Sequence, residues 1–375
     1  MELDASHYWL ALSLTPGLGA RLSGKLLRTF GDPEAVFEAS QTALEAVGLT
    51  STVAKAVVQR DAFPRSEKEM ARLRELGAKL VQWNEAEYPP RLLEIYDPPP
   101  LLYLRGDPLV LRRHSISMVG TRRPSLYGNL MAERLARDLA DRGLVIVSGL
   151  ARGIDSSSHK GACASVCGVA IGVLGTGIDV LYPKENRKLF AEVEKRGAII
   201  SEFPLGTHPS PENFPVRNRI VAGMSLGTII VEGKQYSGSL ITARLAMEFG
   251  REVFGVPGLA TQPSSFAPNQ LVKQGAKLVT CWEDVVEELP TEVRSELFTV
   301  ETPASAERES LFAEALAPEE KKLYALLTVD QPVHVDQLLD QSGMTSSGVL
   351  AVLCEMELKG VIRQMPGKNF VRAVI

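Results

Sequence analysis

Two adjacent arginines follow an apolar run in the segment SISMVGTRRPSLYG, and their side chains suit the binding of a phosphorylated ligand. Arg122 and Arg123 carry guanidinium groups, which form paired hydrogen bonds with phosphate oxygens. Gly120 and Thr121 come just before them, and a glycine lets a ligand approach the backbone closely. If the apolar run is a strand of a parallel sheet, this turn lies at the ligand-binding edge. The alternative is a pair of solvated surface arginines, but their position favours binding of an oligoanion.

The segment PLGTHPSPENFPVRNRIVAGMS combines an aromatic ring with cationic and amide side chains. Phe214 lies near a predicted helix start, with Pro215 in the first turn, where proline is tolerated. Arg217 and Asn218 follow at i+3 and i+4 on the same helix face. Such a set suits one stacked base and its phosphate, and Arg219 is placed to reach the same channel or a partner. The alternative is a phenylalanine that only packs the helix entry.

The loop VIVSGLARGIDSSSH also combines small and basic residues before a predicted helix. Ser148 and Gly149 end a strand, and Arg152 and Gly153 precede the helix. Free amides beside a cation predict a phosphate cradle. In the alternative interpretation, Asp155 merely caps the helix.

Two more loops follow the same plan. Lys184 and Asn186, in LYPKENRKLF, begin a helix either beside the phosphate channel or as an ordinary exposed helix start. In EGKQYSGSLITA, hydroxyls and bare amides at a helix start predict an anion site or generic capping. The residues concerned are Ser237, Gly238, Ser239 and Thr242.

No enzyme signature is complete in the sequence. The patterns GxxxxGK[ST], HExxH and CxxC are absent, and GxGxxG is missing after the first strand. The four cysteines form no metal-ligand pattern, and Cys163 and Cys167 are expected to be a reduced core pair. We therefore expect no catalytic residue, no metal and no cofactor.

Short apolar runs alternate with helical stretches in the region that carries these loops. This pattern predicts an α/β fold with a central Rossmann-like, doubly wound parallel sheet. The predicted strands are ISMVG, LVIVSG, VAIGVL, AIIS, GTIIVE and REVFGV, with LLYLRG leading into the sheet. The predicted helices span 126–142, 155–166, 185–196, 214–224, 240–249 and 269–275.

Four parts are predicted along the chain. Residues 1–83 are similar to a SAM-like helix-hairpin-helix domain, whose glycine turns either meet phosphates or serve only packing. Residues 84–290 form the sheet domain, 291–317 an acidic linker and 318–375 a winged-helix domain. The would-be recognition helix begins at Thr345 and offers few basic or amide side chains. A protein-contact or structural role is therefore favoured over sequence-specific DNA reading.

The charge distribution excludes a broad basic field. The formal net charge is −4, and residues 291–320 alone contain eight acidic and two basic residues. An anion site must therefore be a local basic groove. The N-terminus lacks the basic region of a secretory signal and the apolar runs are too short to span a bilayer, so we expect a cytoplasmic protein.

Five motifs occur in order across the sheet region: GTRRP, SGLARGIDSSSH, GTGIDVLYP, FPVRNRI and SGSLITARLA. In this the chain closely resembles the bacterial DNA-processing protein A family (DprA, also called Smf). The resemblance implies a homodimer that binds incoming single-stranded DNA during natural transformation (competence). It also implies protection of the strand, help in displacing single-strand-binding protein, and loading of the RecA recombinase for DNA recombination, all without bond chemistry.

The resemblance also implies roles for individual residues. Arg122 matches the family's phosphate-gripping arginine, and Phe214, Arg217 and Asn218 match its pocket segment. A basic residue that some relatives carry before the phenylalanine is missing, because Pro-Glu-Asn occupies residues 211–213. Lys184 or Arg219 is the candidate to compensate.

Two rival functions remain open at this point. A nucleotide phosphoribohydrolase-like enzyme has a related fold, but its PGGxGTxxE glutamate has no counterpart in EGKQYSGSLITA. A winged-helix transcription regulator would bind duplex DNA more tightly than single strands, even without residues 110–290.

Overall fold

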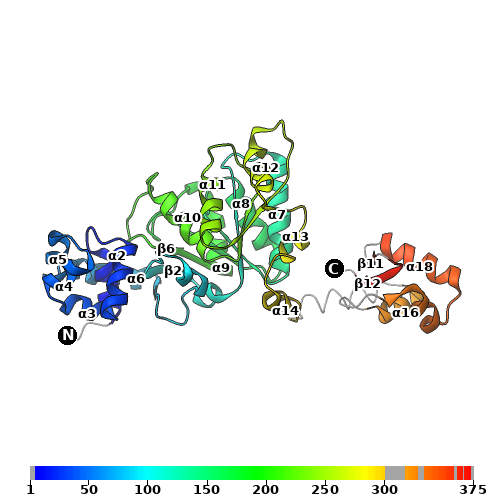
Figure 1. Cartoon of the computed structure of the whole chain (residues 1–375), viewed down its shortest axis with the longest axis horizontal. Helices are drawn as coiled ribbons and strands as arrows, with labels where there is room; N and C mark the ends of the chain where they lie inside the picture. Colours follow the sequence, from blue (N-terminus) through cyan, green and yellow to red (C-terminus); the bar gives the residue numbers. More distant parts are fainter. Residues whose placement is uncertain (1–4, 300–316, 328–332, 359–360, 366, 373–375) are drawn as a thin grey trace. The chain divides into compact units, whose positions relative to one another are not determined.

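The structure is a computed structural model of the chain and describes residues 5–299, 317–327, 333–358, 361–365 and 367–372. It contains two compact units, Met1–Leu297 and Phe298–Ile375 (Figure 1). The predicted linker 291–317 begins as a helix, α14 (Thr291–Thr299), and residues 300–316 of it lie outside the described residues. The described start of the acidic linker is therefore helical.

Six helices form the N-terminal part of the first unit. They are α1 (Ala5–Leu14), α2 (Ala20–Phe30), α3 (Pro33–Glu38), α4 (Gln41–Val47), α5 (Ser51–Val58) and α6 (Phe63–Glu75). Both glycine turns take part in packing. Gly17 has a φ of +81°, and a Cβ there would lie 2.9 Å from Val53 Cγ2. The Lys25 ammonium donates to the carbonyl of Val47, at the end of α4.

A nine-stranded sheet forms the core of the first unit, in the order β1-β2-β6-β5-β4-β3-β7-β8-β9. β1 and β2 pair antiparallel, as do β2 and β6, and the other pairs are parallel. The strands are β1 (Lys79–Gln82), β2 (Leu101–Gly106), β3 (Ser115–Val119), β4 (Val145–Ser148), β5 (Ala170–Val173), β6 (Ala198–Ser201), β7 (Gly227–Ile230), β8 (Glu252–Gly255) and β9 (Lys277–Leu278).

The predicted fold class is confirmed, and each predicted strand and helix corresponds to an observed element. The predicted domain boundary after residue 83 differs from the structure, because β1 already belongs to the sheet through its pairing with β2. The two strands at the sheet's outer edges, β1 and β9, are absent from the predicted set. Each is short and lacks a continuous apolar run.

Helices cover both faces of the sheet. One face packs against α7 (Leu126–Asp141), α8 (Ile154–Ala164) and α9 (Arg187–Arg196). The other packs against α10 (Asn213–Gly223), α11 (Gly238–Glu248) and α12 (Phe266–Lys273). The shorter helices are η1 (Pro90–Glu94), η2 (Pro108–Arg112), η3 (Lys184–Asn186), η4 (Pro263–Ser265) and α13 (Trp282–Val286).

The strand order reverses between β3 and β7. From β3 the chain moves outward through β4, β5 and β6, and then returns to place β7 on the other side of β3. The loops after β3 and β7 therefore diverge to opposite faces and leave a crevice at the carboxyl ends of these strands. Ligands of doubly wound sheets bind at such a switch point.

The second unit is a winged-helix domain, as predicted. It contains α16 (Pro318–Leu326), β10 (Val333–His334), α17 (Val335–Ser342), α18 (Ser346–Leu358), β11 (Ile362–Met365) and β12 (Asn369–Arg372). Its sheet has the order β10-β12-β11. In the parts of both units that the structure describes, no helix has the length and apolar character needed to cross a membrane.

Candidate functional site

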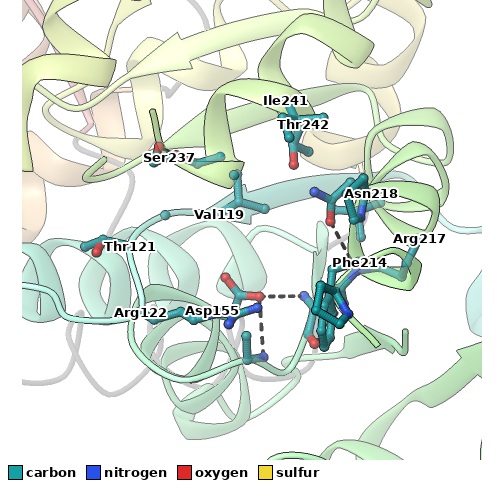
Figure 2. Close-up of a pocket in the computed structure, with 18 of the residues that line it drawn as sticks. Val119, Thr121, Arg122, Asp155, Phe214, Arg217, Asn218, Ser237, Ile241 and Thr242 are labelled. Atoms are coloured by element: carbon teal, nitrogen blue, oxygen red, sulfur yellow. Dashed lines mark hydrogen bonds between the residues drawn. The ribbon is translucent and has the colours of Figure 1, made fainter. Parts of the chain in front are cut away.

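A cavity of about 610 Å³ opens at the β3/β7 switch point (Figure 2). Its walls come from the loops after β3, β4 and β7 and from α10. It brings together many of the residues predicted for the site: Gly120, Thr121, Arg122, Gly149, Phe214, Arg217, Asn218, Ser237, Gly238, Ser239 and Thr242. Loops far apart in the sequence therefore form one surface.

Arg122 stacks on the ring of Phe214. The guanidinium carbon lies 5.1 Å from the ring centroid, within cation–π range. Arg122 is exposed and forms no ion pair with any acidic side chain that the structure describes. The cation beside the Phe214 ring therefore comes from the loop after β3. The sequence pattern instead favours Arg217, which lies on the same helix as Phe214.

Arg217 is buried in the wall of the cavity and donates hydrogen bonds at the carboxyl ends of β4 and β5. Its Nη1 donates to the carbonyls of Gly149, at 2.8 Å, and Val173, and its Nε donates to Asn218 Oδ1 at 3.2 Å. Burial lowers the pKa of Arg217, while the charge of Asp155 opposes this shift. Through these bonds of Nη1 and Nε, Arg217 positions α10. Because Arg217 also lines the cavity, its role in holding a phosphate stays a prediction. A Cβ at Gly149 would lie 2.2 Å from Arg217 Nη1, so only glycine fits there.

Asp155 fills the predicted phosphate cradle after β4. Its carboxylate accepts from the amides of Gly149 at 3.1 Å and Ala151 at 3.4 Å. Burial raises the pKa of Asp155, and the Arg217 charge and these amides oppose the shift. The amides that we expected to meet phosphate are thus occupied, and the helix is not capped by Asp155. Its N-cap is Gly153, which has a φ of +80°, and a Cβ there would lie 2.3 Å from the carbonyl oxygen of Thr121.

The start of α11 forms the opposite wall of the cavity. Its N-cap residue, Ser237, makes no side-chain cap hydrogen bond, and its hydroxyl pairs instead with that of Ser239. The first amides of a helix have no partner within the helix, and they form its positive end. Figure 2 shows Ser237 and Thr242 along this wall. An anion would be stabilised here without a charged side chain.

Other predicted residues do not line the cavity: Arg123, Ser148, Arg152, Gly153, Lys184, Asn186 and Arg219. Ser148 is buried and donates to the carbonyl of Met118 at 2.7 Å. Asn186 donates to the carbonyl of Leu150 at 2.8 Å and so supports the β4 loop. Both are structural residues in this fold.

The remaining cations point elsewhere. Arg152 pairs with Glu185. Arg219 is buried between Asp97, at 3.3 Å, and Glu202, because α10 turns it away from Phe214. Arg219 therefore cannot compensate for the missing basic residue before Phe214. Arg123 and Lys184 are exposed, outside the cavity lining.

Sequence reasoning missed Tyr182 and the N-terminal helix α6. The ring of Tyr182 lies 5.9 Å from that of Phe214 and lines the cavity. Its only sequence signal was an aromatic residue next to the GTGID loop. On α6, Glu69 accepts from Tyr103 Oη at 2.7 Å and from the Leu205 amide at 2.8 Å, and so holds the segment that leads to α10.

The metal-ligating and thiol side chains of the described residues do not form a cluster at the cavity. Among the described residues, no three His, Cys, Asp or Glu side chains gather as metal ligands. Cys163 is buried, and burial raises its pKa to about 11, whereas Cys167 is exposed. The expected core pair is therefore wrong for Cys167. What the cavity offers is a guanidinium, a helix start and two aromatic rings.

Comparisons with known proteins agree with this fold. The profile of the family "DNA recombination-mediator protein A" matches residues 79–290, and that of the "DprA winged helix domain" matches residues 304–368. The Bacillus subtilis DNA processing protein DprA is 43% identical over 229 residues, which cover 61% of this chain and 77% of the relative. Protein Smf of Escherichia coli is 38% identical over 335 residues, 88% of this chain and 86% of the relative.

Two solved structures are also similar. The X-ray structure of DprA from Streptococcus pneumoniae has a TM-score of 0.69 and 34% identity, covering 77% of this chain and 99% of that one. DprA from Helicobacter pylori, described for its single-stranded DNA binding mode, has a TM-score of 0.52 and 30% identity, covering 57% and 97%. With its sheet, its winged helix and these relatives, the chain belongs to the DNA recombination-mediator protein A family, DprA/Smf.

Proposed function

We propose that this chain binds single-stranded DNA in the cavity at the β3/β7 switch point. The observation that carries the proposal is the exposed Arg122 guanidinium stacked on Phe214, facing the uncapped start of α11. A cation and a helix start hold two phosphates, and the ring accepts a base face. Stacking and phosphate contacts do not depend on base identity, so the binding is without sequence preference.

Family membership supports the wider role. We propose that the protein shields incoming single strands during natural transformation, displaces single-strand-binding protein and loads RecA. The family's description as a recombination mediator supports this role, as does the DNA-binding mode described for the Helicobacter pylori relative. We further propose that it acts in the cytoplasm as a homodimer through the sheet domain.

We also propose that the protein does no bond chemistry. The two carboxylates at the switch point are engaged: Asp155 by amides and Glu232 by the amide and hydroxyl of Ser125, at 2.9 and 2.6 Å. Neither is placed as a free general base. Incubation with nucleoside monophosphates and with DNA should release neither free base nor cleaved strand.

The test is a fluorescence-anisotropy titration with labelled single-stranded and duplex oligonucleotides at several salt concentrations. We expect the protein to bind single strands more tightly than duplexes, and we expect Arg122→Ala to lose most of its affinity for single strands. Arg137→Ala is the matched control, because Arg137 is an exposed arginine on α7 that does not line the cavity. Unchanged affinity in Arg122→Ala, or preference for duplex, would reject the proposal.

A further inference from the structure

A second cavity of about 530 Å³ adjoins the first one. It is lined by Thr121, Lys234, Gln235, Tyr236, Ser237, Pro263 and Phe266. Two of these residues, Thr121 and Ser237, also line the cavity that holds Arg122 and Phe214. The two cavities are therefore adjacent, and Thr121 and Ser237 form the rim between them.

The second cavity repeats the chemistry of the first. Tyr236 is 92% exposed and Phe266 40% exposed, so both rings present apolar surface to solvent. Lys234 is exposed and forms no ion pair with an acidic side chain in the described parts of the chain. Among the residues that the structure describes, no carboxylate lines this cavity. A cation beside unpaired aromatic rings is the combination that binds a nucleotide of an unpaired strand.

The loop that carries Tyr236 has a fixed base. The Gly233 amide donates to the carbonyl of Ser264 at 2.6 Å, and the Ala267 amide donates to the carbonyl of Gly233 at 2.8 Å. The Thr121 amide donates to the carbonyl of Glu232 at 2.8 Å, which links this loop to the one after β3. The backbone at the base of this loop is thus tied to the residue that precedes Arg122.

We infer that the DNA strand crosses the rim between Thr121 and Ser237 and that the second cavity holds its next nucleotide. Lys234 binds the phosphate, and Tyr236 with Phe266 accepts the base. The inference rests on the function proposed above, and extends it by a second nucleotide subsite. A site built of two subsites binds strands more tightly once they are long enough to fill both.

Length dependence tests the inference. The affinities of oligothymidylates from 3 to about 20 nucleotides are measured by anisotropy for the full chain and for Tyr236→Ala. The affinity of Tyr236→Ala should be at least about fivefold lower than that of the unchanged protein for the longest strands. For the shortest strands that bind, it should be less than about twofold lower. Lys234→Ala should show the same length-dependent loss of affinity as Tyr236→Ala. Tyr236→Phe should retain the affinity because the ring remains. Equal affinity of Tyr236→Ala and the unchanged protein at every length would overturn the inference.

Two control variants distinguish a failure of the second subsite from a failure of the proposed DNA-binding function. Tyr96→Ala removes another exposed tyrosine, which packs on Phe249 at the far end of α11, and should bind normally. If Arg122→Ala loses affinity at all lengths while Tyr236→Ala never does, the second subsite is wrong and the first stands. If Arg122→Ala has no effect, the proposed function itself fails. Sedimentation is measured alongside, and loss of binding together with a change of oligomeric state would assign Tyr236 to a copy–copy contact and overturn the inference.

Discussion

The Arg122 guanidinium carbon lies 5.1 Å from the ring centroid of Phe214, although the two residues are far apart in the sequence of the sheet domain. Arg122 follows β3 and Phe214 lies in the first turn of α10, which precedes β7. They meet because β7 returns to pair with β3. The stacked pair is thus a direct product of the sheet's reversal of direction.

Phe214→Ala should weaken single-stranded DNA binding by about 1–3 kcal/mol, the range for loss of one stacked base. Phe214→Tyr retains the ring and should bind within about twofold of the unchanged protein. Anisotropy titration measures both. Because the guanidinium rests on this ring, the loss in Arg122→Ala/Phe214→Ala should be smaller than the sum of the single losses. Strictly additive losses would show that the two residues act independently.

Arg122 and Arg123 should differ although they are neighbours of identical type. Removing one cation that binds a phosphate of a single strand reduces the slope of log K against log salt by about 0.7. We expect this reduction for Arg122→Ala, whereas Arg123→Ala should change the slope less, because Arg123 does not line the cavity. A larger effect of Arg123→Ala would place the strand on a different surface.

Glu69→Ala should destabilise the first unit and loosen the approach to Phe214. The change leaves the Tyr103 hydroxyl and the Leu205 amide without their acceptor, which costs about 1–3 kcal/mol. Urea unfolding followed by tryptophan fluorescence measures this, because all three tryptophans lie in the first unit. Glu67→Ala, at an exposed position of the same helix, is the control. Equal unfolding midpoints for the two variants would contradict the role of Glu69.

His159 should make the first unit acid-sensitive. It is fully buried on α8, and burial lowers its pKa from 6.5 to about 3. Between these values the unfolded chain binds the proton and the folded one does not, so the free energy of unfolding falls as pH falls below 6.5. From pH 7.5 to 5.0 this group should remove about 2 kcal/mol.

The comparison with His159→Gln isolates that contribution. The buried carboxylates Asp155 and Glu202 have raised pKa values and act in the opposite direction, but both proteins share them. Unfolding at both pH values should show a shallower pH dependence in the variant. Parallel curves would mean that folding leaves the pKa of His159 unchanged.

The sequence predicted the sheet because parallel strands buried on both faces appear as short apolar runs between helical stretches. It also placed the binding edge, since loops with small and basic residues follow those runs. It could not separate Arg122 from Arg217. Both are arginines beside a turn. Only the packing shows that Arg122 is exposed and stacks on a ring, whereas Arg217 is buried and donates hydrogen bonds to the carbonyls of Gly149 and Val173.

Long-range partners explain the other differences. Arg219 is adjacent to Asn218 in sequence, yet its ion pairs come from Asp97 and Glu202 on distant elements. The residues near Arg219 in the sequence do not predict that Asp97 and Glu202 are its partners. The same holds for Asp155, whose acceptor role depends on how the β4 loop folds back over it.

Binding of the strand in the cavity at the β3/β7 switch point is tested by photo-crosslinking of a single strand that carries 5-iodouracil, followed by mapping of the crosslinked peptides. We expect crosslinks to the peptides that contain Phe214 and Tyr182, and we expect these crosslinks to disappear when Arg122 is replaced by alanine. Crosslinks confined to residues 5–75 or to the winged-helix unit, with none at the β3/β7 switch point, would contradict it.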